Sequence, residues 1–420
     1  MGQFIDRIDA AAPADKWPLV RRLMTDERQP FFAELRAERP VMDLPGGMVF
    51  ITRHADCTLV LQRWNDFGVD LYKPKQGDYF MAQDDTADHW RDKSVMKSIL
   101  DFEEIPELRA FVGREAARIL KQANGAIDAP PQLTRMVPCR LVQERFGFTG
   151  SDADKLIEWS YWNQTDAFHN QFFDTDVIAD PGFVVAQRKK AGIRLAFYLG
   201  RVLLKRWVQL KLHRDKTDSV TRLLRLSRSG ALKDFGLSKV LFNAGGLLIG
   251  TIETTSVTVN NALAELLSRP EELARARAAA ADPDPTQFDG YVVEALRFNP
   301  AFPYFFRTCH TPTQLAGGTP HAREVRPGAG EHGTTIIACT HSAMFDEGAY
   351  PDPGAFDPRR TMYQTFTLGY GHHECLGRAI ATVMIPEIVR QCLLLPGLRA
   401  EGPPEFENGV PEHYRLKWDA

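Results

Sequence analysis

Neither sign of charge dominates this chain of 420 residues, because 51 lysines and arginines face 54 aspartates and glutamates and leave a net charge of −3. A protein that binds nucleic acid carries a basic excess, so this balance argues against such a partner. A long apolar run is also missing. The most apolar stretch, near residues 241–252, is too short and too closely followed by polar residues to cross a bilayer, and no signal-peptide pattern opens the sequence. We therefore expect a cytoplasmic protein with no membrane and no nucleic acid among its partners.

Cysteine is scarce as well, with six residues at positions 57, 139, 309, 339, 375 and 392. Their spacing matches no disulfide framework, so we expect the cysteines other than Cys375 to be reduced core residues. His372, His373 and Cys375 are close enough in sequence to suggest zinc, but no second Cys/His pair lies at zinc-site spacing. Repeats and low-complexity segments are absent too. With 44% hydrophobic residues, the composition is that of a globular protein with a large core.

What the chain does have is a glycine-rich segment that presents one cysteine before a helical run, Leu368-Gly369-Tyr370-Gly371-His372-His373-Glu374-Cys375-Leu376-Gly377. A thiolate needs positive surroundings and N–H donors, and glycine lets the backbone approach the sulfur closely enough to donate. The segment resembles the cysteine loop of the cytochromes P450, which are haem-thiolate monooxygenases. It matches in both glycines before Cys375, in the basic residue two before it and in the glycine two after it. Leu368 departs from the family, which usually has phenylalanine there.

This resemblance implies a haem b cofactor whose iron is bound by Cys375, since a thiolate ligand pushes electron density onto the iron and favours O–O cleavage. It also implies that Leu368, Gly369 and Gly377 contact the haem. The lack of an N-terminal anchor resembles the soluble bacterial members of the family.

A second signature is the pair Glu294 and Arg297, which share one face of a predicted helix. A surface ion pair is the commoner outcome of this spacing. Here apolar neighbours surround the charges and Pro300 ends the helix, so we expect a buried pair. The pattern resembles the Glu-x-x-Arg helix of the family, whose charges lock to an arginine before the cysteine loop. Arg360 is the predicted third member.

A third signature is the glycine- and threonine-rich run at residues 245–255, inside a longer apolar stretch. Such residues are poor helix formers, so we expect a long core helix that is locally opened, with threonine hydroxyls bonded back to the backbone. The alternative is a closely packed core helix that uses small residues for contact. Glu253 and Thr254 match the acid–threonine pair with which the family manages protons during dioxygen reduction, and we count both, with Thr251, as candidate catalytic residues. Thr251 departs from the glycine usual in the family.

A haem carries two propionates, which require cations. His89 and Lys93 are four residues apart on a predicted helix and resemble the family's His-x-x-x-Arg, although a lysine cannot make the forked contact of an arginine. Arg307 matches an arginine that follows the Glu-x-x-Arg helix, and His373 matches the basic residue before the cysteine. The resemblance therefore implies one haem site built from these four residues, whereas each alone could be a solvated charge or a satisfied histidine.

Analogy with the substrate-contacting regions of the family predicts an apolar pocket. Its expected lining is Leu247, Leu248, Phe302, Tyr304 and Phe305. Core packing is the alternative for many of these residues, because aromatic side chains dominate protein cores.

The fold class expected from these patterns is mainly α with a smaller β-rich portion, a cytochrome P450 fold in a single haem domain over residues 1–420. Glycine and proline between β-branched segments place the β-rich portion at about 39–53 and 301–345. Helical periodicity dominates about 88–299 and 376–394.

The function implied is a monooxygenase that inserts one oxygen atom of dioxygen into an apolar small molecule. Electrons would come from NAD(P)H through a separate ferredoxin and its reductase, because no flavin or iron–sulfur segment is found in the chain. Two alternatives remain open: a peroxide-driven or oxygen-independent haem-thiolate enzyme, and a non-catalytic haem sensor or carrier. The expected protein is a monomer.

Overall fold

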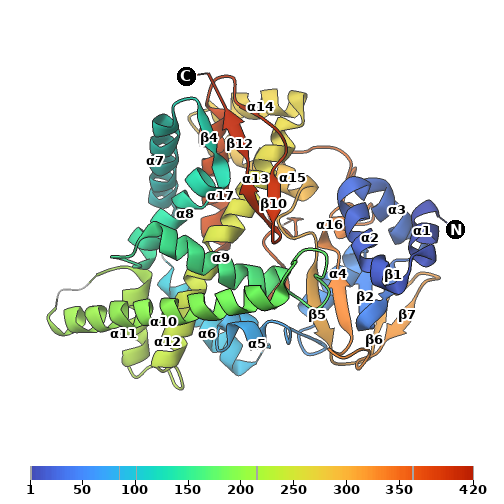
Figure 1. Ribbon diagram of the computed structural model, residues 1–420, viewed down its shortest axis with the longest axis horizontal. Helices are drawn as coiled ribbons and strands as arrows, with labels where there is room; N and C mark the ends of the chain where they lie inside the picture. The colour runs from blue at the N-terminus through green and yellow to red at the C-terminus, as the bar shows by residue number, and fades with distance from the viewer. Residues whose placement is uncertain (1, 85, 101, 214–215, 362–363, 420) are drawn as a thin grey trace.

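The computed structural model describes residues 2–84, 86–100, 102–213, 216–361 and 364–419. It is mostly helical with small sheets, which confirms the predicted fold class. Figure 1 shows the N-terminal helices and the largest sheet at one end of the molecule and the longest helices at the other. Eight residues of the predicted 1–420 domain (1, 85, 101, 214, 215, 362, 363 and 420) lie outside the described residues.

The α-helices are α1 (Gln3–Ala10), α2 (Pro13–Asp26), α3 (Arg28–Glu38), α4 (His54–Gln62), α5 (Lys73–Gln76), α6 (Ala87–Ile99), α7 (Ile105–Ala123), α8 (Met136–Leu141), α9 (Ala153–His169), α10 (Pro181–Lys211), α11 (Ser219–Arg228), α12 (Leu237–Ile249), α13 (Ile252–Leu267), α14 (Pro270–Ala280), α15 (Thr286–Phe298), α16 (Thr340–Ala343) and α17 (Arg378–Leu393). Short 3-10 or π turns are η1 (Pro45–Gly47), η2 (Phe80–Ala82), η3 (Pro130–Thr134), η4 (Val142–Phe146) and η6 (Gly371–His373). The strands are β1 (Val41–Leu44), β2 (Met48–Ile51), β3 (Phe67–Gly68), β4 (Ala126–Asp128), β5 (Phe305–Cys309), β6 (Thr313–Leu315), β7 (Arg323–Val325), β8 (Thr335–Ala338), β9 (Arg399–Ala400), β10 (Glu405–Glu407), β11 (Val410–His413) and β12 (Arg415–Lys417).

The largest sheet has the order β1-β2-β8-β5-β3 and is antiparallel except where β2 lies beside β8. It joins the hairpin near residue 45 to strands from the 301–345 region. The other sheets are β4-β12-β9, β10-β11 and β6-β7. Helices α1 and α2 were not predicted from the sequence. The strands after residue 394 were not predicted either, because they have only two to four residues and show no usable alternation of apolar and polar side chains.

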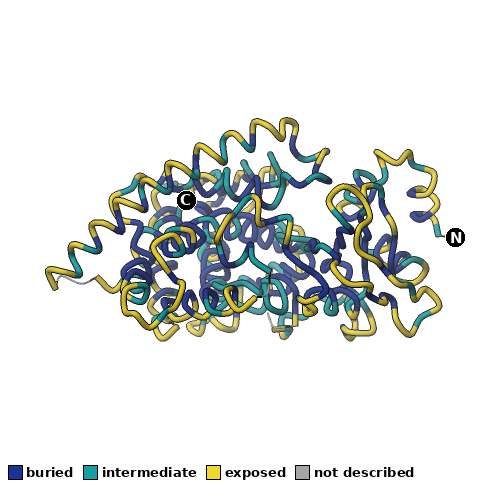
Figure 2. Tube along the Cα trace, turned by 90° about the horizontal axis from the view of Figure 1, so that it is seen from below, coloured by how far each residue is buried: buried dark blue, intermediate teal, exposed yellow. Residues whose placement is uncertain are grey.

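The largest hydrophobic cluster lies between the helices and includes α13, and two smaller clusters lie against the largest sheet. Val259, Ala262, Leu263 and Leu266 are fully buried there. The span Leu237–Leu267, which joins α12 and α13, is long and apolar enough to cross a membrane, but 67% of its most apolar window is buried inside the fold. Figure 2 shows this buried interior and the exposed outer helices. The span therefore has the burial of a core helix.

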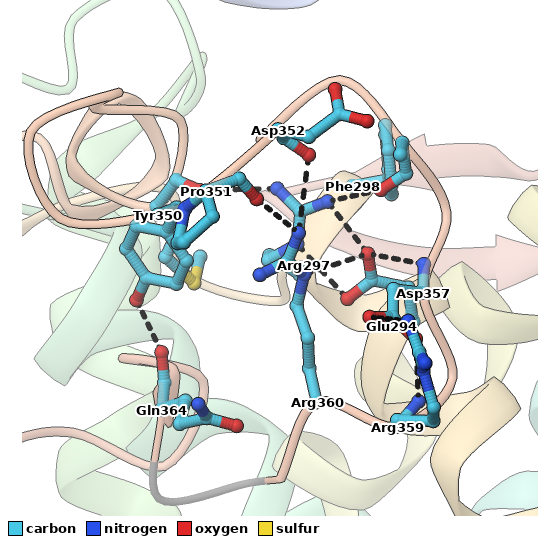
Figure 3. Close-up of polar contacts among 12 residues, drawn as sticks. Glu294, Arg297, Phe298, Tyr350, Pro351, Asp352, Asp357, Arg359, Arg360 and Gln364 are labelled. Atoms are coloured by element: carbon cyan, nitrogen blue, oxygen red, sulfur yellow. Dashed lines mark hydrogen bonds and ion pairs between the residues drawn. The ribbon is translucent and has the colours of Figure 1, made fainter.

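A buried ion pair anchors the segment that leads to Cys375 (Figure 3). Arg297 Nη2 and Nε lie 2.6 and 3.0 Å from the two carboxylate oxygens of Glu294, and both side chains are fully buried. Arg297 also donates to the carbonyl oxygens of Met344 and Ala355 at 3.0 and 3.1 Å. The pair thereby ties α15 to the irregular chain at 344–360.

The predicted third charge lies beside this pair. Arg360 Nε is 3.4 Å from Glu294 Oε1, and its Nη2 donates to the carbonyl oxygens of Pro351 and Asp352. The Asp357 amide donates to Glu294 Oε1 at 3.0 Å. Glu294 therefore has several donors besides Arg297, as a buried carboxylate requires.

Removal of either charge should make the folded protein less stable. Glu294→Ala strands a buried guanidinium and Arg297→Ala strands a buried carboxylate, so each should lower the free energy of unfolding by about 3–5 kcal/mol. Urea denaturation measures this loss. The control Glu115→Ala breaks a pair with the same spacing on α7, whose Arg118 side chain is 45% exposed, and should cost about 0–1 kcal/mol. Equal losses for Glu294→Ala and the control would contradict the role of the buried pair.

Candidate functional site

The long central helix is opened where glycine and threonine interrupt it. Helix α12 ends at Ile249 and α13 begins at Ile252. Thr251 Oγ1 donates to the Leu247 carbonyl at 2.6 Å, and Thr254 Oγ1 donates to the Gly250 carbonyl at 2.7 Å. These bonds from side chain to backbone satisfy carbonyls of the broken ladder. The predicted opening is confirmed.

The cysteine loop approaches this opening from the other side. Gly369 and Gly371 have φ of 74° and 68°, a region that favours glycine, and a side chain at 371 would clash with the Leu61 carbonyl. The Cys375 amide donates to the Leu368 carbonyl at 2.8 Å. Burial raises the pKa of the Cys375 thiol, while the Gly377 amide and the nearby cations lower it. The loop thus supplies an N–H donor to the sulfur, and Arg378 of α17 and Lys93 of α6 supply positive charge, as a thiolate ligand requires.

A cavity lies between the opened helix and the cysteine loop. Many predicted site residues line it: Leu247, Thr251, Thr254, Phe302, Phe305, Arg307, Leu368, Gly369, His373, Cys375 and Gly377. Tyr72, Gln76, Tyr79 and Met81, from the loop before α6, line it as well. The structure therefore brings together residues from positions 72 to 377 around one space.

Two predicted pocket residues lie elsewhere. Leu248 is fully buried in the core on the other side of α12, and its carbonyl accepts from Ser160. Tyr304 packs edge-on against Trp17, with ring centroids 5.4 Å apart. Neither is among the cavity-lining residues, because consecutive residues of a helix or an extended chain point in different directions.

The predicted cations gather at one side of the cavity. The His89 and His373 rings are 4.7 Å apart, and Lys93 Nζ donates to the His372 carbonyl. Arg307 reaches the same place from β5. Burial lowers the pKa of His373, and the charge of Arg307 lowers it further. His373 and Arg307 line the cavity, whereas His89 and Lys93 stand behind His373 and are not among its lining residues.

Two buried polar groups here call for a ligand. Arg307 is 6% exposed and donates to the Phe306 carbonyl, yet no carboxylate of the described residues forms an ion pair with it. His373 Nδ1 is buried and has no hydrogen-bond partner among the described residues. A buried cation without an anion is costly. A planar group with carboxylates at this side and a metal at the thiol, as in a haem, would satisfy both, so the residues fit the cofactor implied by the resemblance.

The structure gives Glu253 partners that the sequence did not reveal. Glu253 is fully buried, and its Oε2 accepts from Arg135 Nε at 2.8 Å. Two Arg135 nitrogens bond to the Glu412 carboxylate, both at 2.9 Å. Burial raises the pKa of Glu253 to about 7, although Arg135 lowers it. Its Oε1 has no hydrogen-bond partner among the described residues, and Glu253 does not line the cavity, so it stands behind the helix opening.

Tyr79 is a second feature that sequence reasoning did not single out within its loop. A side chain at Gly246 would overlap the Tyr79 ring, so the ring packs closely on α12. Burial, followed by the Cys375 charge, raises the pKa of the Tyr79 hydroxyl. The contact explains one glycine of the apolar run by close approach.

No protein-family model matches the chain. Erythromycin C-12 hydroxylase of Saccharopolyspora erythraea is 26% identical over 355 residues, which are 83% of this chain and 81% of that protein. Cytochrome P450 monooxygenase PikC of Streptomyces venezuelae is 28% identical over 289 residues, which are 69% of this chain and 61% of PikC. The structure of cytochrome P450 CYP109Q5 from Chondromyces apiculatus has a TM-score of 0.76 at 20% identity and covers 95% of this chain and 97% of that one. The fold is therefore shared over nearly the whole chain.

Loss of Arg135 should make stability fall more steeply with rising pH. In Arg135→Leu the buried Glu253 loses its cation, so its folded pKa rises further above the unfolded value of 4.5. A raised folded pKa means that the native state holds a proton which the unfolded chain releases, so stability falls as the pH rises through that window. We expect a loss of about 3–5 kcal/mol at neutral pH and a smaller loss near pH 4.5, measured by urea denaturation.

Arg135→Leu also breaks the ion pair between Arg135 and Glu412, and a second substitution measures that contribution separately. Glu412 is 23% exposed, so Glu412→Gln should cost about 0–1 kcal/mol. A loss for Arg135→Leu that does not change with pH would show that Glu253 is not held by this arginine.

Proposed function

This chain belongs to the cytochrome P450 superfamily, and from that membership we propose that it is a monooxygenase that inserts one oxygen atom of dioxygen into an apolar secondary metabolite. The observation that supports this most directly is the convergence on one cavity of the Cys375 thiol, the Thr254 hydroxyl at the opened helix and the Arg307 guanidinium, which pairs with no carboxylate of the described residues.

We propose haem b as the cofactor. Cys375 Sγ would bind its iron, and Arg307 and His373 would face its propionates, with His89 and Lys93 behind them. Leu368, Gly369 and Gly377, which line the cavity beside Cys375, would contact it. When bound, the haem supplies the activation of dioxygen, which no amino-acid side chain can perform.

The chain itself would bind the substrate, exclude water and deliver protons. The Thr254 hydroxyl lines the cavity and can pass a proton there, and the Thr251 hydroxyl is a second candidate. Glu253 can take up and release a proton near neutral pH, because burial raises its pKa to about 7, and it lies one residue before Thr254. Arg135 and Glu412 would connect Glu253 to the protein surface, because Glu412 is partly exposed.

The cavity favours an apolar substrate. Phe168, Phe302, Phe305, Tyr72 and Leu247 line it, and Gln164 offers a polar group. The names of two relatives, erythromycin C-12 hydroxylase and mycinamicin IV hydroxylase/epoxidase, specify macrolides, and a third is a C-19 steroid 1alpha-hydroxylase. We propose a molecule of this general kind, a largely apolar secondary metabolite.

The proposed electron source is NAD(P)H, through a ferredoxin and a ferredoxin reductase. The proposed setting is the cytoplasm, with the chain as a monomer. A peroxide-driven enzyme is the second candidate function. One observation favours it: Thr251 places a branched side chain on the cavity where the family usually has glycine. This residue would favour a peroxide-driven enzyme if it hinders the dioxygen route. A haem sensor or carrier is disfavoured, because it needs no acid–threonine pair.

Turnover with different electron supplies tests the proposal. We expect product from an apolar substrate with NAD(P)H, ferredoxin and reductase, and much less product with peroxide alone. Candidate substrates can be selected by their low-spin to high-spin shift of the haem spectrum. Product with peroxide alone would favour the second candidate, and no product under either condition would leave only a sensor or carrier.

The same assay tests the proton-delivery role of Thr254. Thr254→Ala removes a hydroxyl at the cavity and should preserve haem binding and the substrate-induced shift. Product formed per NAD(P)H should fall by about 100-fold or more while hydrogen peroxide release rises, because general acid–base groups typically contribute about 10²–10⁴-fold. Thr251→Gly and Thr255→Ala are matched controls. Full coupling in Thr254→Ala with uncoupling in a control would move the role to that threonine, and full coupling in all three would exclude a threonine hydroxyl.

A further inference from the structure

Helix α10 has an unusual charge composition. Among its 31 residues, Pro181–Lys211, it carries eight basic side chains and no acidic one, whereas the whole chain has a net charge of −3. The basic residues are Arg188, Lys189, Lys190, Arg194, Arg201, Lys205, Arg206 and Lys211. Positive charge is therefore concentrated on one straight element, about 46 Å long at 1.5 Å per residue.

Neighbouring elements neutralise only part of this charge. Arg188 pairs with Asp166 at 3.0 Å, Arg194 with Glu158 at 3.3 Å and Arg206 with Asp218 at 2.7 Å. Lys211 lies over the Trp207 ring. The remaining four cations are exposed and form no ion pair in the part of the chain that the structure describes: Lys189, Lys190, Arg201 and Lys205.

An apolar stripe runs between these cations along the same outer face. Ile193, Phe197 and Leu204, at i, i+4 and i+11, are 59%, 73% and 61% exposed. Val208 and Leu212 continue the stripe, and Phe183 lies near the other end. These six are half of the large hydrophobic side chains exposed among the described residues. Figure 2 shows α10 as a long helix at the edge of the molecule, with exposed residues along its outer side.

We propose that this outer face of α10, defined by Ile193, Phe197, Leu204, Lys189 and Lys205 with their neighbours, binds the surface of an anionic membrane. A helix with an apolar stripe flanked by lysine and arginine is suited to lie in the plane of a lipid surface, where the stripe enters the acyl boundary and the cations meet phosphates. The span Leu237–Leu267 has the burial of a core helix, and a surface contact through α10 needs no segment that crosses the bilayer. This proposal departs from the sequence-based expectation of no membrane partner.

The charge and the shape of this face favour an anionic membrane surface over a protein partner. A second copy that used the same face would place cation against cation, which is repulsive. An acidic protein could supply the charge, but protein interfaces are depleted in lysine, and four of the six exposed cations on α10 are lysines. The face is also the outer side of a single helix at the edge of the molecule (Figure 2), so a protein partner would need a matching groove, whereas a lipid surface adapts to it.

Co-sedimentation of the haem-loaded full chain with vesicles tests the proposal. We expect binding to vesicles of phosphatidylcholine with phosphatidylglycerol, weaker binding at high salt, and little binding to phosphatidylcholine alone. Lys189→Gln combined with Lys205→Gln should weaken binding roughly thirtyfold, because each cation near an anionic surface contributes roughly fivefold. Phe197→Ser combined with Leu204→Ser should weaken it by at least about tenfold.

Matched controls lie on other surfaces. Phe406→Ser removes a hydrophobic side chain that is 54% exposed on β10, and Lys121→Gln removes an exposed cation of α7. Both should bind vesicles like the parent. Absence of binding to anionic vesicles would overturn the proposal, and so would equal losses in the α10 variants and the controls. Sedimentation equilibrium on the same proteins would reveal a dimer broken by Phe197→Ser, which would assign the face to a second copy instead.

Discussion

The buried pair of Glu294 and Arg297 is the interaction on which the site depends most. It is fully enclosed, and its donors and acceptors reach the backbone at Met344, Ala355 and Asp357. Those residues belong to irregular chain, which has no ladder of hydrogen bonds of its own to fix it. This chain leads directly to the cysteine loop. The position of Cys375 therefore relies on a charge pair on α15, far from it in sequence.

Local patterns in the sequence were enough to predict the elements that face each other across the cavity. Glycine around Cys375 and glycine with threonine at 245–255 are poor choices for stability, so each signals a backbone that must bend or approach closely. The structure has positive φ at Gly369 and Gly371 and an opened helix before Ile252. The hairpin near residue 45 and the strands at 305–338 were also predictable, because turn residues separate β-branched runs.

Other features depended on distant pairings that no local pattern encodes. Arg135 meets Glu253 across 118 residues and Glu412 across 277 residues. Strand β12 pairs with the distant strand β4, Ala126–Asp128, and both have only three residues. The misassigned pocket residues have a related cause. Leu248 follows Leu247 on α12, and helical geometry turns consecutive side chains by about 100°, so only one faces the cavity.

The central claim is that the cavity holds a haem whose iron is bound by Cys375. The chain contains five other cysteines, and four of them, Cys57, Cys139, Cys339 and Cys392, are fully buried with raised pKa values. The most direct measurement is the absorption spectrum of the reduced protein with carbon monoxide, compared for the parent, Cys375→Ser and the control Cys392→Ser. The account predicts the strongly red-shifted Soret band of thiolate ligation in the parent and in Cys392→Ser, and its loss in Cys375→Ser. A red-shifted band that persists in Cys375→Ser would contradict it.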